Sequence, residues 1–143
     1  MITPAPQLLL STGTVYVWPL QAAFRLAREA GCDGVELVVA PELGLRGVTA
    51  IGRLAADVGT AIRAIHPPLF TLPGWRNESE ALLRLVDLAL ALGIRTIVIH
   101  PPKAQSLNDP QLATFAAHIA LAHQRLAGSG SQITIETPGF FRP

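Results

Sequence analysis

The sequence predicts an α/β fold built on a parallel sheet, the first part of a (β/α) barrel. Short apolar runs alternate with longer amphipathic segments along the 143 residues, which implies parallel strands joined by right-handed crossovers. Polar side chains end successive apolar runs at Glu36, His66, His100 and Glu136, at intervals of 30, 34 and 36 residues. One β/α unit takes about 30 residues or more, so these intervals match its length.

The first strand is expected at Gln7–Ser11, a short apolar run. A helical pattern follows from Pro19 to Gly31, with its apolar residues on one face and a glycine in the position that commonly ends helices. The continuous run Gly34–Val39 predicts a second strand. It ends at Pro41, after which we expect a glycine-containing loop.

The next two units follow the same order. A weaker helical pattern runs from Ile51 to Gly59, and Ala61–His66 is the expected third strand. This strand stops at Pro67, because proline cannot donate to the sheet. The third helix begins at Asn77, a good N-cap, and runs to Gly93.

The fourth strand is expected at Arg95–His100, where the residues are apolar or β-branched on both faces, as in a buried parallel strand. Asp109 and Pro110 begin the fourth helix as N-cap and first residue. The fifth strand is Gln132–Glu136. Eight units take about 250 residues, so we expect one domain over residues 1–143 that is an incomplete TIM-type barrel of five strands and four helices. A small open-sheet, doubly wound domain is the alternative.

Two histidines and a glutamate end neighbouring strands of this sheet. His66 and His100 each open a His-Pro-Pro tripeptide, and Glu136 opens Glu-Thr-Pro. Neighbouring strands lie about 4.8 Å apart, so the three side chains can converge on one ion. Two imidazoles and a carboxylate suit Zn²⁺, Mn²⁺, Co²⁺ or Fe²⁺ better than Ca²⁺. A structural role for each histidine is the alternative.

Other polar and aromatic residues are candidates for substrate binding. Glu36 ends an apolar strand, so it is expected to bind substrate, to hydrogen-bond a ligand histidine or to pair with an arginine. Lys103 follows the second His-Pro-Pro and can meet an anionic substrate. Trp18, in the loop after the first strand, either walls a pocket or caps the barrel. His118 and His123 fall on the fourth helix and are expected to be surface or packing residues.

Composition narrows the function classes. The net charge of +1 gives no electrostatic case for nucleic acid as a partner. The single cysteine excludes an internal disulfide framework and fits a reducing compartment, and no apolar stretch reaches the ~20 residues of a membrane span. We therefore expect a cytoplasmic protein. The sequence carries no Walker-type loop, Cys-x-x-Cys pair or Gly-x-Ser-x-Gly elbow.

The chain resembles the xylose isomerase-like barrel superfamily, the sugar phosphate isomerase/epimerase group that also includes endonuclease IV. The resemblance rests on four segments, whose sequences are PLQAAFRLAREAGCDGVEL (19–37), AIHPP (64–68), LALGIRTIVIHP (90–101) and ITIETP (133–138). It implies that Glu136 is a metal ligand and a proton-transfer residue. It implies that His66 and His100 bind zinc, as in endonuclease IV, or line the substrate pocket, as in the isomerases.

The sequence departs from the family pattern in two ways. Thr137 stands where the family usually has asparagine, and the ligands carried by strands six to eight have no counterpart here. The first interpretation is the amino-terminal part of a metal-dependent sugar or sugar-phosphate isomerase/epimerase, with manganese, zinc, cobalt or magnesium as cofactor. An endonuclease IV-like zinc phosphodiesterase is the second. A non-catalytic truncated or split product that associates with itself or with a complementing half-barrel is the third.

Overall fold

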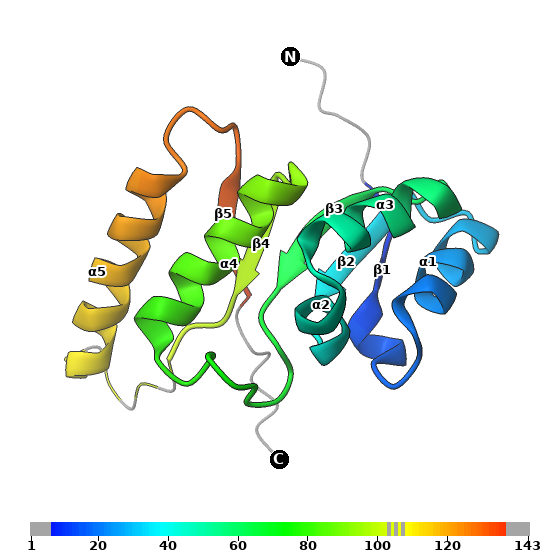
Figure 1. Cartoon of the computed structure of the whole chain (residues 1–143). Helices are drawn as coiled ribbons and strands as arrows, with labels where there is room; N and C mark the ends of the chain where they lie inside the picture. Colours follow the sequence, from blue (N-terminus) through cyan, green and yellow to red (C-terminus); the bar gives the residue numbers. More distant parts are fainter. Residues whose placement is uncertain (1–6, 103, 105, 107, 137–143) are drawn as a thin grey trace.

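The computed structural model describes residues 7–102, 104, 106 and 108–136 and contains a five-stranded parallel sheet (Figure 1). The strand order β1-β2-β3-β4-β5 confirms the predicted topology. Within the described residues, β1 and β5 each pair with one strand only, so the sheet is not closed into a barrel. The strands are β1 (Leu9–Ser11), β2 (Gly34–Val38), β3 (Ile62–His66), β4 (Thr96–Ile99) and β5 (Gln132–Ile135).

The described part of the chain has five α-helices and one 3-10 turn, one helix more than the sequence predicts. The additional helix, α2, lies where a loop was expected. Pro41 is its first residue, and the ion pair between Arg46 Nε and Glu42 Oε1, 2.7 Å long, spans one turn. The helical elements are η1 (Thr12–Val15), α1 (Leu20–Glu29), α2 (Pro41–Arg46), α3 (Val48–Val58), α4 (Glu78–Leu92) and α5 (Pro110–Arg125).

Two helix starts are fixed by the side chains that the sequence predicts as caps. The Asn77 carboxamide oxygen accepts hydrogen bonds from the backbone N–H groups of Ser79 and Glu80 at the start of α4. Asp109 accepts one from Gln111 N–H at the start of α5.

No helix in the described ranges is both long enough and apolar enough to cross a membrane.

All the helices cover one face of the sheet (Figure 1). Strands in sequential order with right-handed crossovers require this arrangement. The main core lies between helices and sheet, and its fully buried members include Phe24 of α1 and Val35, Leu37, Ile65 and Ile97 of the strands. Side chains alternate along a strand, so Glu36 and His66 lie on the opposite, helix-free face, and His100 and Glu136 directly follow β4 and β5.

Candidate metal centre

His66, His100 and Glu136 come together at the carboxyl edge of the sheet, on its helix-free face. One ligand atom from each lies within 4.8 Å of the other two. The register explains how residues from three strands meet. Ile65 pairs with Ile97, so His100 lies two residues further along than the neighbour of His66. The stagger of a barrel sheet lets His66 and His100 meet diagonally.

The atomic geometry is that of a small, partly open cluster. The two Nε2 atoms of His66 and His100 are 2.8 Å apart, with the rings edge to face. Glu136 Oε2 lies 3.8 Å from His66 Nε2 and 3.9 Å from His100 Nδ1. The His66 side chain is 8% exposed, whereas those of His100 and Glu136 are 49% and 57% exposed. His66 is therefore the buried member of the cluster, and solvent reaches the side chains of His100 and Glu136.

Hydrogen bonds fix the tautomer of His66. Its Nδ1 lies 2.7 Å from the carbonyl oxygen of Pro67, which can only accept, so Nδ1 carries the proton. In the neutral ring, Nε2 then has a free lone pair and accepts from His100 Nε2–H. Metal binding by both Nε2 atoms requires His100 to carry its proton on Nδ1 instead, the nitrogen that faces Glu136. The His66 tautomer is thus the one that binds a metal ion through Nε2.

Glu36 lies on the same face of the sheet but outside the cluster. It pairs in register with Ala64, two residues before His66. Its Oε1 accepts a 2.7 Å hydrogen bond from Ser11 Oγ at the end of β1. The contacts of the described residues therefore give Glu36 a hydroxyl partner rather than an arginine or a ligand histidine. Ser11 is not among the residues predicted for the site, although it is a polar residue that ends the first strand at the same edge.

Trp18 is not part of the cluster. Trp18 lines a cleft between α1 and α2 that contains none of the three clustered residues. Lys103 lies outside the described residues. His123 is exposed on α5, as expected. His118 is half-buried and lines a second cavity of about 520 Å³ between α4 and α5, together with His100 and Trp75.

The family comparison agrees with the fold. A model of the xylose isomerase-like TIM barrel matches residues 24–142. The chain belongs to this family. An uncharacterised protein of Mycobacterium tuberculosis is 36% identical over 102 residues, which are 69% of this chain and 36% of the relative. The chain thus matches only about a third of the length of this curated relative.

Solved structures show the same fold at low sequence identity. The 3-keto-D-glucoside 4-epimerase YcjR of E. coli is 14% identical, with a TM-score of 0.68, and the match covers 92% of this chain and 56% of that one. The IOLI protein, solved with a bound zinc atom, is 15% identical, with a TM-score of 0.70 over 94% of this chain and 52% of that one. The xylose isomerase-like fold is therefore shared with a sugar epimerase and with a zinc-binding protein.

Proposed function

We propose that His66, His100 and Glu136 bind one divalent metal ion, and that in the whole protein this ion serves sugar isomerase or epimerase chemistry. The observation that carries the proposal is the convergence of two imidazoles and a carboxylate within 4.8 Å at the carboxyl edge of the sheet. This edge is where parallel α/β barrels build their active sites. The mixed nitrogen and oxygen donors suit zinc, manganese or cobalt, and magnesium is also a candidate.

The residues have separate roles in this proposal. His66 is the buried anchor, because Pro67 already holds its ring with Nε2 directed at the cluster. Glu136 is 57% exposed, so it can contact both the ion and a substrate carbon beside a carbonyl. It serves as ligand and as the base that removes the proton. A bound divalent ion would polarise the substrate oxygens and favour the enediolate form.

Glu36 is proposed as a substrate contact. Ser11 holds one of its carboxylate oxygens, and a carboxylate has further lone pairs for sugar hydroxyls. Its place on the helix-free face, two residues before the level of His66, supports this role. Lys103 and Trp18 are also proposed as substrate contacts.

Metal binding tests the proposal directly. Mn²⁺ and Zn²⁺ titrations of the 143-residue chain, followed by calorimetry, should show one site. His100→Ala should weaken it by at least about 100-fold, because it removes a ligand. His123→Ala is the matched control, since it removes an exposed histidine of α5 that is not part of the cluster. Equal affinity in wild type and His100→Ala would contradict the proposal.

The reaction class needs a second measurement, on a longer chain that includes the rest of the barrel. With Mn²⁺ in D₂O, an isomerase or epimerase should incorporate deuterium at the carbon beside the carbonyl of a ketohexose, and Glu136→Gln should abolish this exchange. The two-imidazole, one-carboxylate donor set also favours a second candidate, a zinc phosphodiesterase. Cleavage of abasic DNA without deuterium exchange would select that function instead.

A further inference from the structure

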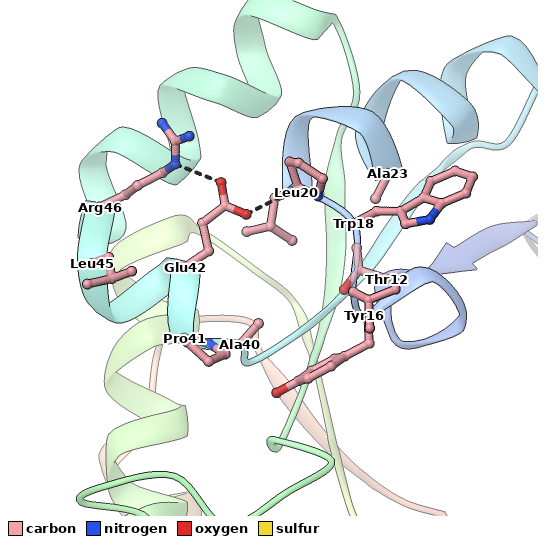
Figure 2. Close-up of a pocket in the computed structure, with 12 residues that line it drawn as sticks. Thr12, Tyr16, Trp18, Leu20, Ala23, Ala40, Pro41, Glu42, Leu45 and Arg46 are labelled. Atoms are coloured by element: carbon pink, nitrogen blue, oxygen red, sulfur yellow. Dashed lines mark hydrogen bonds and ion pairs between the residues drawn. The ribbon is translucent and has the colours of Figure 1, made fainter.

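A cleft separate from the metal centre lies at the same edge of the sheet, between the start of α1 and the short helix α2 (Figure 2). Its volume is about 450 Å³. Thr12, directly after β1, and Ala40, two residues after β2, contribute to its walls. Val38 at the end of β2 pairs in register with His66, so the cleft is one strand away from the metal centre.

One side of the cleft is aromatic. Trp18 lines the cleft and is 51% exposed, so part of its side chain is available for contact. Tyr16 also lines the cleft, and its ring packs edge to face against Phe70, with centroids 5.6 Å apart. Phe70 belongs to the loop that follows His66. The aromatic side therefore connects the cleft to the loop beside the metal centre.

The other side is charged but internally balanced. Glu42 accepts hydrogen bonds from the backbone N–H of Leu20 and from Arg46 Nε, at 2.8 and 2.7 Å (Figure 2). The first N–H of α1 is thus occupied by Glu42, which disfavours an anion at this helix start. Arg46 is about half exposed and contacts Glu42 through Nε, so its terminal N–H groups can donate to a ligand.

The lining of the cleft combines two aromatic rings with a carboxylate–guanidinium pair, and this combination matches a neutral, polyhydroxylated ring. The apolar face of a sugar stacks on indole, while its hydroxyl groups exchange hydrogen bonds with Glu42 and Arg46. A phosphate would meet the negative charge of Glu42 next to Arg46. The chemistry of the cleft therefore favours a neutral sugar ring over a sugar phosphate.

We infer that this cleft is a second carbohydrate subsite, which binds the non-reacting ring of a glycoside or disaccharide whose reacting sugar lies at the metal centre. The inference rests on the proposed function for the reacting sugar, but the cleft is built from other residues. It narrows the expected substrate class from a sugar or sugar phosphate to a neutral glycoside with two rings.

Binding of simple probes to the 143-residue chain tests this subsite. The Trp75→Phe background leaves Trp18 as the single fluorescent tryptophan. In this background, methyl glucoside and cellobiose should quench the fluorescence saturably, and glucose 6-phosphate should bind more weakly. Without the background change, Trp18→Ala should weaken cellobiose binding, measured by calorimetry, by roughly fivefold or more. Leu121→Ala, at an exposed residue on α5, is the control and should leave it unchanged.

The outcomes separate this inference from the proposed function. His100→Ala should lose metal affinity but keep methyl glucoside binding in the cleft. Absence of saturable glycoside binding, tighter binding of glucose 6-phosphate, or equal cellobiose binding by Trp18→Ala would each overturn the subsite. Loss of methyl glucoside binding in a folded His100→Ala variant would also overturn it, because the two sites would then be one.

Discussion

His66 Nε2 and His100 Nε2 lie 2.8 Å apart although the residues are 34 positions apart in the sequence. Two zinc–nitrogen bonds of about 2.0–2.1 Å at a tetrahedral angle separate the nitrogens by about 3.3 Å. The rings therefore need to part by only about half an ångström to accept an ion. The spacing of the two nitrogens is therefore close to that of two histidine ligands of one zinc ion.

A double-mutant cycle should detect this shared role. If both rings bind one ion, His66→Ala and His100→Ala each remove most of the Zn²⁺ affinity, and the double variant loses little more than either single variant. Calorimetric titration of the four proteins measures the coupling. Strictly additive losses would mean that the histidines bind independently, and His118→Ala provides a control for general effects on the edge of the sheet.

Thr12 has a structural role beside the site. It is 3% exposed, and its Oγ1 accepts a 2.9 Å hydrogen bond from the buried backbone N–H of Val38. Thr12→Val leaves that N–H unpaired and should cost about 1–3 kcal/mol in the free energy of unfolding. Thr14→Val is the matched control, because the Thr14 hydroxyl bond is exposed and its loss should stay within about 0.5 kcal/mol. Urea denaturation of both variants gives the comparison.

Tyr16 should make the stability of the protein sensitive to high pH. Its hydroxyl is buried without a hydrogen-bond partner among the described residues, and desolvation by this burial raises the pKa of the phenol above 10.0. The unfolded chain then loses the proton first, so stability should fall as the pH rises above about 10. Tyr16→Phe should reduce this fall and should also stabilise the protein by about 1 kcal/mol at neutral pH. Identical pH profiles for the two proteins would refute the assignment.

Gly34 is required by the close approach of β2 and β3. A Cβ atom at this position would collide with the backbone carbonyl of Ala61 and with the Arg63 side chain. The backbone carbonyl cannot shift without disturbing the sheet, so Gly34→Ala should lower the free energy of unfolding by about 2 kcal/mol or more. Gly52→Ala, in α3, is the control. A Cβ at Gly52 would meet only Leu92, at van der Waals distance, and alanine stabilises a helix relative to glycine by up to about 1 kcal/mol. The melting temperatures of the two variants should therefore shift in opposite directions from that of the wild type.

The open edge of β5 should promote association of the 143-residue chain. Ile135 is 46% exposed on this strand, which pairs only with β4 among the described residues. An unpaired strand with an exposed apolar side chain is a template for pairing with another chain. Light scattering should show mass that rises with concentration, and Ile135→Lys should lower it. Leu121→Lys, at a similarly exposed leucine on α5, should change it much less.

The sequence by itself determined the order of the elements apart from α2, the topology and the identity of the clustered residues. Strand and helix periods are local properties of the chain, and so are caps such as Asn77 and Asp109, because each depends on neighbours within a few residues. The recurrence of His66, His100 and Glu136 at strand ends was likewise visible, since parallel strands bring equivalent positions to one edge.

Only the tertiary structure decided how these side chains meet. The stagger between β3 and β4 sets the 2.8 Å approach of His66 to His100, and a register shift of one residue would have turned one ring toward the helices. The hydrogen-bond partner of Glu36 is Ser11, which lies 25 residues earlier in the sequence. The side chain that accepts from the first N–H of α1 is Glu42 of another helix, α2. Such contacts join distant segments, so their geometry follows from packing rather than from any local pattern.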